Sequence, residues 1–215
     1  MLPKYEKNWP DAEMIATFEE GDSQENPWVN GKPKPEQIDV EAYDPQWHIL
    51  FENLKEDIEQ ALPEHALAIE HVGSTAVPQL PAKPVIDIDL IVEDPENEAL
   101  YVPALEKLGY QLTVRERSWY QHRMLRLNEP RVNLHVFAPN CPEHIRHILF
   151  RDWLITHAAD RELYGDAKMS AKDGVDNVQT YNMKKQAVVR EIYARLFEAY
   201  RLYQANRAYE VTRSV

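Results

Sequence analysis

The sequence predicts an α+β protein, with a short mixed β-sheet flanked by helices and followed by a helical C-terminal segment. Up to about residue 140, runs rich in β-branched and aromatic residues alternate with helical patterns, and beyond that point the pattern is helical. The hydrophobic fraction of 44% is sufficient for a packed core. We expect three parts: an irregular N-terminal extension at 1–38, an α+β core at 39–140, and a helical segment at 141–215 that packs on the core.

The N-terminal extension is rich in Gly, Pro, Asn and charged residues, a composition that is typical of loops. It also contains the aromatic residues Trp9, Phe18 and Trp28. Because aromatic side chains favour burial, we expect this irregular part to dock on the body of the protein.

The remaining elements follow from hydrophobic periodicity. Strands are expected at 66–72, 84–92, 110–115, 119–127 and 131–137. Helices are expected at 45–62, 95–108, 142–157, 160–172 and 177–204. Asp44 as N-cap and Pro45 in the first turn favour the start of the first helix, and Gly109 suits the position after the end of the second.

Composition restricts the function classes. The single cysteine, Cys141, excludes an internal disulfide framework. No apolar run approaches the roughly 20 residues of a membrane span, and the start lacks the apolar core of a secretion signal, so we expect a cytoplasmic protein without a membrane anchor. The formal charge of −12 argues against general nucleic-acid binding, because phosphate backbones are held mainly by Lys and Arg. A local basic pocket for a small phosphorylated ligand is compatible with that charge.

Two acidic residues interrupt the apolar strand pattern PVIDIDLIV at 84–92. Side chains alternate faces along a strand, so Asp87 and Asp89 project from the same side, about 6.5–7 Å apart at their Cα atoms. Two such carboxylates repel each other unless a positive charge lies between them, and oxygen ligands of this kind suit Mg²⁺ or Mn²⁺. A strand face on which both acids are solvated explains the pair alone equally well.

The turn before this strand favours the metal interpretation. Gly73 permits a positive φ and a close approach of the backbone, and Ser74 or Thr75 can cap the turn that follows. Backbone amides at such a turn bind anions. Phosphates at Gly73 and Ser74, with a metal at Asp87 and Asp89, would together hold a nucleoside triphosphate, a layout suited to phosphoryl or nucleotidyl transfer.

A Gly-Ser pair, followed about a dozen residues later by Asp, an apolar residue and Asp, resembles the DNA polymerase β-type nucleotidyltransferase superfamily. The fuller string IEHVGSTAVPQLPAKPVIDIDL is similar to the GrpB family of bacterial nucleotidyltransferase-like proteins. Further matching pieces, in the family's order, are YDPQW, NLHVF, LFRDWL and YNMKK. The resemblance covers roughly residues 40–200 and implies the nucleotidyltransferase fold.

The sequence departs from active nucleotidyltransferases in one ligand. Their third carboxylate lies on a later strand, and the corresponding pattern here, RVNLHVF, offers Asn133 and His135. The GrpB family commonly has histidine there, so the resemblance implies either that His135 is a softer metal ligand or that the site is catalytically silent. Gln79 also stands where the family usually has Gly, which affects the shape of the loop after the turn.

Three functions follow from these patterns. The first is metal-dependent transfer of a nucleotidyl group from a nucleoside triphosphate to a small acceptor, with Asp87, Asp89 and His135 as catalytic residues and as ligands of Mg²⁺ (or Mn²⁺). The second is a non-catalytic nucleotide-binding module with a degraded site. The third, a purely structural or interaction protein, is disfavoured by the retained Gly-Ser pair and both aspartates.

Further residues are candidates for nucleotide contacts. Lys83 lies at the mouth of the expected site, and Arg123 shares the face of the acids if the strand register allows it. Tyr181 and Lys185, four residues apart on one helix face, belong to the segment that the resemblance expects to close over a nucleotide. His71 fits a hydrogen-bonded structural role slightly better than a functional one.

Cys141, His144 and His147 have a spacing that suggests zinc, but the set lacks a fourth ligand and is not a standard structural site. We expect both histidines on an exposed helix. Arg151, in LFRDWL, is expected to form an ion pair between a helix and the body.

Overall fold

The computed structural model describes residues 9–32, 39–171 and 178–213. Its centre is a five-stranded sheet in the order β1-β2-β5-β4-β3. β2 and β5 run parallel, and the other neighbouring strands are antiparallel. The strands are β1 (Ala68–Val72), β2 (Ile86–Ile91), β3 (Gln111–Glu116), β4 (His122–Leu127) and β5 (Val132–Phe137). The predicted α+β class with a short mixed sheet is confirmed.

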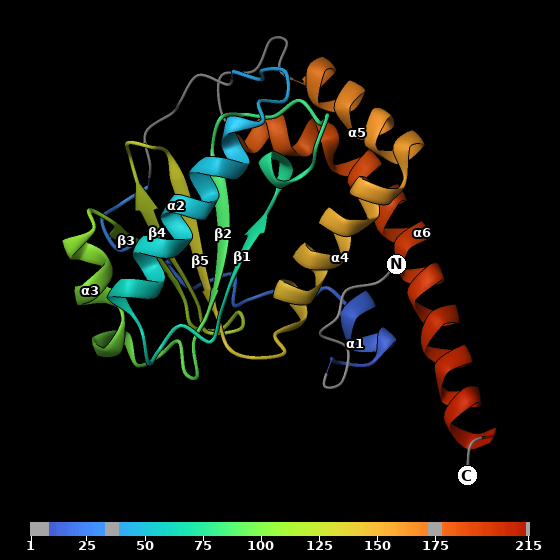
Figure 1. The fold of residues 1–215 in the computed structure, drawn as a ribbon, viewed down its shortest axis with the longest axis horizontal. Helices are drawn as coiled ribbons and strands as arrows, with labels where there is room; N and C mark the ends of the chain where they lie inside the picture. The colour runs from blue at the N-terminus through green and yellow to red at the C-terminus, as the bar shows by residue number, and fades with distance from the viewer. Residues whose placement is uncertain (1–8, 33–38, 172–177, 214–215) are drawn as a thin grey trace.

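Helices lie on both sides of this sheet (Figure 1). α2 and α3 lie over one side, whereas α4, α5 and α6 gather on the other side of the molecule. The helices are α1 (Ala12–Ala16), α2 (Gln46–Ala61), α3 (Val102–Lys107), α4 (Pro142–Thr156), α5 (Ala158–Ala171) and α6 (Val178–Arg213), with 3₁₀ turns η2 (Ser74–Ala76) and η3 (Glu98–Leu100). No helix in the described part of the chain is both long and apolar enough to cross a membrane.

The main core lies between the sheet and α2. Ile86, Ile88 and Leu90 alternate along β2, and all three are buried against this side. α2 meets them with apolar residues at helical spacing: Trp47, Phe51, Leu54 and Ile58. Each such side chain contributes about 1.5–3 kcal/mol on burial, which fixes the orientation of β2. Its other face, with residues 87 and 89, therefore points toward α4.

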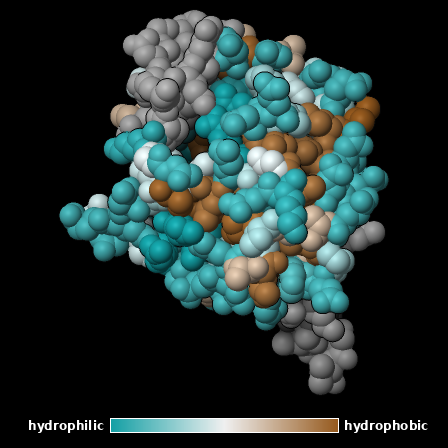
Figure 2. Space-filling view, turned by 90° about the vertical axis from the view of Figure 1, so that its left-hand side faces the viewer, coloured by the Kyte–Doolittle hydropathy of each residue, from teal (hydrophilic) through white to brown (hydrophobic). Residues whose placement is uncertain are grey.

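The described part of the N-terminal extension, residues 9–32, docks on the body, as its aromatic residues predicted. Trp28 forms an antiparallel bridge with Val114, so the extension continues the sheet at the free edge of β3. Phe18 packs edge-on against Tyr193 of α6, with ring centroids 5.4 Å apart. Figure 2, which faces the side of the molecule where α3 and β3 lie, shows apolar surface in the middle and hydrophilic residues around it.

Two predicted helices differ in length from the observed ones by several residues. The helix expected at 95–108 is shorter, because the Asp94 carboxylate accepts a hydrogen bond from the Glu96 amide at 2.9 Å and holds a turn there instead. Gly109, with φ of +93°, follows the end of this helix as expected. α6 continues beyond 204 to Arg213.

Candidate functional site

The turn between β1 and β2 depends on a glycine. Gly73 has φ of +68° and ψ of −166°, a conformation that is almost restricted to glycine. A Cβ atom at this position would collide with the Asp87 side chain. The sequence uses glycine here because the turn passes directly over the first acid of β2, as the spacing of the motif suggested.

Asp87 and Asp89 lie on the same face of the sheet, as predicted. In the parallel pairing of β2 with β5, Asp87 is opposite Asn133 and Asp89 is opposite His135. The strand RVNLHVF is thus the direct neighbour of the acid pair, and the two residues in place of a third carboxylate stand beside the two aspartates.

Asp89 is a buried carboxylate held by α4. One of its oxygens is 2.9 Å from Nδ1 of His144 and 3.0 Å from Nδ1 of His147. Burial favours the neutral acid, but the positive charge of His147 and both hydrogen bonds outweigh it and hold the pKa of Asp89 below its usual range. Burial disfavours the charge on His147, yet Asp89 and Glu143 raise its pKa well above the ordinary value. The positive charge that the paired acids required is therefore supplied by a protein side chain.

This contact corrects one prediction. His144 and His147 were expected on an exposed helix, but the side chains of both are mostly buried, because α4 packs across the sheet. Sequence spacing placed them correctly on a helix and could not show which side of it docks.

Asp87 is in a different environment from Asp89. Its Oδ1 accepts a hydrogen bond of 2.9 Å from the Asn133 amide, and its other oxygen faces Gly73. Burial raises the pKa of Asp87, while Asn133 and the charges of Lys83, His147 and Lys185 oppose that rise. Asp87 consequently lies between the turn and a group of lysines.

His135 belongs to a chain of hydrogen-bonded side chains. Its Nδ1 is 3.0 Å from Nε2 of His122, whose Nδ1 is 2.7 Å from Glu116. Burial, together with His122, lowers the pKa of His135 to about 3, so that its imidazole is neutral at pH 7.

These contacts do not fit the predicted Mg²⁺ site of Asp87, Asp89 and His135. The Asp89 oxygens accept hydrogen bonds from histidines, and one His135 nitrogen is bonded to His122. Within the described ranges, no three His, Cys, Asp or Glu side chains are arranged to hold a metal ion. Magnesium also prefers oxygen ligands to imidazole, so these three residues, paired as they are here, do not form a magnesium site.

Lysines converge near Asp87 from separate parts of the chain. The Nζ atoms of Lys83 and Lys185 lie 5.4 and 4.8 Å from the ring centroid of Tyr181. Lys185 also lies 5.6 Å from the ring centroid of Tyr164, and Lys168 lies 4.9 Å from the same centroid. We call Lys83, Lys168 and Lys185 the lysine cluster.

Sequence reasoning missed Lys168 in this cluster. A signal was present, because YGDAK at 164–168 and YNMKK at 181–185 both place a tyrosine and a lysine four residues apart on a helix face. The pairing of the two helices that brings these patterns together depends on long-range packing.

Other predicted site residues have structural roles. Thr75 is buried, and its hydroxyl donates to the Val85 carbonyl at 3.1 Å and contacts His71 at 3.0 Å. His71 stacks on Phe51 and so has the structural role that was slightly favoured. Ser74 is partly exposed beside Gly73 and remains available to a ligand.

Arg123 lies on the opposite face of the sheet from the acids. It is 3% exposed and pairs with Glu98 at 2.8 Å, so the structure corrects its assignment to the nucleotide site. Arg126, opposite Asn133 in the register, is the β4 arginine that shares the acid face. The predicted ion pair of Arg151 is present, with Glu70 of β1 at 3.0 Å.

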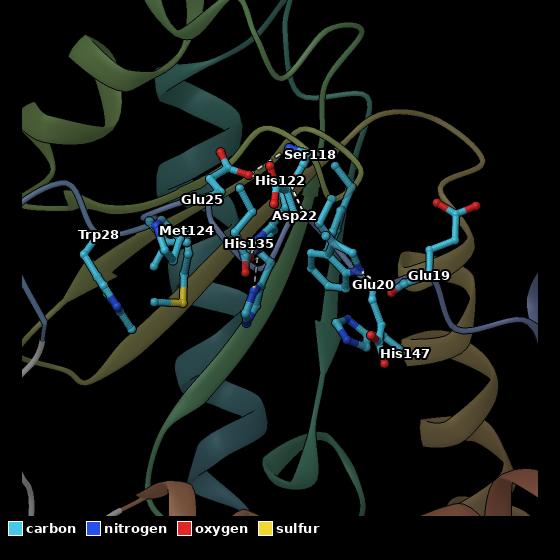
Figure 3. Close-up of a pocket in the computed structure, with 16 residues that line it drawn as sticks. Glu19, Glu20, Asp22, Glu25, Trp28, Ser118, His122, Met124, His135 and His147 are labelled. Atoms are coloured by element: carbon cyan, nitrogen blue, oxygen red, sulfur yellow. Dashed lines mark hydrogen bonds and ion pairs between the residues drawn. The ribbon is translucent and has the colours of Figure 1, made fainter.

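A cavity of about 600 Å³ opens beside His135 and His147. Figure 3 shows residues that line it: His122 and His135 of the sheet, His147 of α4, and residues of the N-terminal extension that include Glu20 and Asp22. Acids, histidines and aromatic side chains form the lining, and within the described residues it contains neither lysine nor arginine. Its charge is thus opposite to that of the lysine cluster.

The fold and this site define a class of protein. A short mixed sheet in which a Gly-Ser turn faces an Asp-x-Asp strand is the arrangement that the resemblance to nucleotidyltransferase-like proteins implied. The model of the family described as "GrpB protein" matches residues 37–195, so the chain belongs to the GrpB family. The cavity wall formed by the N-terminal extension lies outside that matched region.

Individual relatives agree with the family. The chain is 43% identical to the UPF0157 protein BH1888 of Halalkalibacterium halodurans, over 76% of this chain and 85% of the relative. It is 34% identical to the UPF0157 protein SCO7215 of Streptomyces coelicolor, over 78% and 88%. The crystal structure of the conserved protein GrpB from Enterococcus faecalis aligns with a TM-score of 0.66 and 32% identity, over 75% of this chain and 99% of that chain.

Proposed function

We propose that this protein binds a nucleotide through its phosphate groups, beside the Gly73 turn and Asp87. The convergence of Lys83 and Lys185 on the ring of Tyr181 carries this proposal. Like charges that gather without matching counter-charges destabilise one another. These lysines gather at one place even though the chain as a whole has a formal charge of −12. A small phosphorylated ligand would supply the missing negative charge, and the nucleotidyltransferase-like arrangement favours a nucleoside triphosphate.

The site favours binding over turnover. Asp89 already has a cationic partner in His147, and Asn133 and His135 occupy the positions beside the acids where a third carboxylate would lie. Nucleotidyl transfer needs ions that orient the acceptor and stabilise the reacting phosphorus. We therefore propose a non-catalytic nucleotide-binding module as the primary function.

Metal-dependent transfer of a nucleotidyl group to a small acceptor is the second candidate. Two acids on one face at a Gly-Ser turn favour it, with Mg²⁺ or Mn²⁺ as the ion. The acceptor would bind in the cavity beside His135. The acidic and aromatic side chains that line this cavity suit an acceptor that is a small cation. This candidate requires Asp89 to exchange its histidine partners for the ion.

A thermal-shift screen with ATP, GTP, CTP and UTP, in EDTA and in Mg²⁺ or Mn²⁺, separates these functions. A ligand at 100 times its Kd stabilises the folded state by about 2.7 kcal/mol, which is a rise in Tm of roughly 5–10 °C at this chain length. We expect such a rise with at least one triphosphate, a reduced rise in Lys185→Met, and an unchanged rise in Lys107→Met, which alters an exposed lysine on α3.

Release of pyrophosphate is measured in parallel on the same samples. The primary proposal expects none. Metal-dependent release would establish the second candidate instead, and the absence of a Tm change with every triphosphate would contradict both.

A further inference from the structure

Lys168 is the most unusual charged residue of the lysine cluster. It lies on α5, its side chain is fully buried, with the residue 2% exposed, and its Nζ has no hydrogen-bond partner within the described part of the chain. A buried polar group without a partner costs roughly 1–3 kcal/mol, and proteins rarely retain one without a reason. The ring of Tyr164, 4.9 Å from Nζ, provides only a face to lie against.

The surroundings of Lys168 are predominantly positive. Burial lowers its pKa well below the ordinary value, and the charges of Lys185 and Lys83 lower it further, while Asp87 opposes them. Lys83 responds in the same way: burial and then Lys185 lower its pKa. In the free protein the charged form of this amine is therefore disfavoured, and its Nζ has no partner among the described residues.

Asp87 cannot serve as the missing partner. One of its oxygens already accepts a hydrogen bond from Asn133, the other faces Gly73, and no ion pair joins it to a lysine within the described residues. The oxygen atoms that would accept hydrogen bonds from the lysine cluster must therefore be supplied by something other than the described residues. A phosphate group has three terminal oxygens and about two negative charges, which matches a set of ammonium donors.

We propose that Lys168 is a further ligand-binding residue, and that Lys83, Lys168 and Lys185 together form a subsite for one phosphate group of the ligand. This inference rests on the proposed function and names the residues that contact the phosphate. The phosphate brings negative charge next to the amine of Lys168 and so favours its protonation. We therefore expect binding to raise the pKa of Lys168, which calorimetry measures as the uptake of protons.

The groups that face Lys168 limit the alternatives for that proton. Lys185 and Tyr181 come from α6, and Tyr164 is on α5. Lys83 lies in the loop before β2, and Asp87 is on β2 itself. Burial raises the pKa of Tyr181 above its ordinary value, so it stays protonated near pH 8. Lys83 and Asp87 are the other groups whose protonation a phosphate can change, and the substitution of Lys168 alone separates its contribution from theirs.

Isothermal titration calorimetry at pH 8, in two buffers of different ionisation enthalpy, measures both affinity and proton uptake. The probes are inorganic pyrophosphate and ATP, titrated separately so that a phosphate-only site is distinguished from a nucleotide site. The proteins are the wild type, Lys168→Met, which keeps the length of the side chain, and Lys107→Met as a surface control. At pH 8 ATP is deprotonated, whereas pyrophosphate retains one proton that it can release on binding. The ionisation of each probe is common to all three proteins, so the comparison between them isolates Lys168.

We expect Lys168→Met to bind about 10-fold or more weakly and to take up measurably fewer protons than the wild type, with Lys107→Met unchanged. If Lys168→Met binds as tightly as the wild type with the same proton uptake, Lys168 is not a ligand and the proposed function stands. If the wild type binds neither probe, the proposed function is overturned and this inference with it.

A measurement on the wild type alone protects the test against a variant that does not fold. Affinity for ATP should weaken as the pH rises from 8 to 9.5, because the subsite must be protonated to bind and ATP does not change its own protonation in this range. Affinity that stays constant across this range contradicts the proposal.

Discussion

The glycine of the turn provides the sharpest test of how the site is built. In Gly73→Ala the new Cβ meets the Asp87 side chain, in a backbone conformation with φ of +68°. A non-glycine residue in this region costs about 1–3 kcal/mol, and displacement of the buried Asp87 adds a cost of the order of 1 kcal/mol for its disturbed hydrogen bond to Asn133. We expect a total loss of roughly 2–4 kcal/mol.

Gly31→Ala is the matched control for this substitution. Gly31 also has a positive φ, +83°, but a Cβ there meets nothing within 4 Å. It should show only the backbone cost of about 1 kcal/mol that a left-handed conformation imposes. The difference between the two variants therefore measures the collision with Asp87 together with the larger backbone cost at Gly73.

Urea denaturation of both variants, followed by far-UV circular dichroism, gives the two free energies of unfolding. At this chain length each kcal/mol corresponds to about 2–4 °C in Tm, so Gly73→Ala should melt roughly 4–16 °C below the wild type. It should also lose nucleotide binding, because the turn and Asp87 can no longer lie against each other. Equal losses of stability in the two variants would refute the claim that the turn is packed onto Asp87.

The remaining predictions concern the buried charges. Asp89→Asn leaves His147 with Glu143, at 3.5 Å, as its remaining anionic partner and should cost about 3 kcal/mol of unfolding free energy near pH 6. Because the pKa of His147 is raised in the folded state, the stabilisation by this ion pair is complete below the unfolded pKa of about 6.5 and is lost as pH rises through the folded pKa. Urea titrations should therefore show a larger difference in unfolding free energy between wild type and Asp89→Asn at pH 6 than at pH 9. A difference that does not depend on pH would disprove the ion pair. Lys168→Met should raise the free energy of unfolding by about 1–3 kcal/mol at pH 7, because it removes a buried amine without a partner. The pKa of Lys168 is lowered in the folded state, so the unfolded wild type binds more protons and the wild type gains stability as pH rises toward about 10. The excess unfolding free energy of Lys168→Met over the wild type should therefore decrease between pH 7 and pH 9.5. An excess that increases over this range would contradict the burial of this lysine.

Local pattern was sufficient to predict the part of the site that lies in one continuous stretch. The turn at Gly73, the alternation of Asp87 and Asp89, and the strand of Asn133 and His135 each follow from spacing and from the two-residue period of a strand. The same reasoning identified the mixed sheet and the helical segment that follows it.

Features that depend on packing between distant elements were not predictable from the sequence. Arg123 and Arg126 are both on β4, and only the register with β5 decides which one shares a face with the acids. The partners of Asp89 are two histidines of α4 because that helix docks across the sheet, and Lys168 reaches the site only because α5 packs on α6. A pattern shows that a helix has a buried face, whereas the residues it meets there are set by the whole fold.

Direct titration of the full chain with ATP in EDTA, by isothermal titration calorimetry, tests the central claim of a lysine-lined site for nucleotide phosphates. We predict saturable binding at one site, with affinity that decreases in Lys185→Met and is unchanged in Lys107→Met. Equal binding by both variants, or no heat of binding to the wild type, would contradict it.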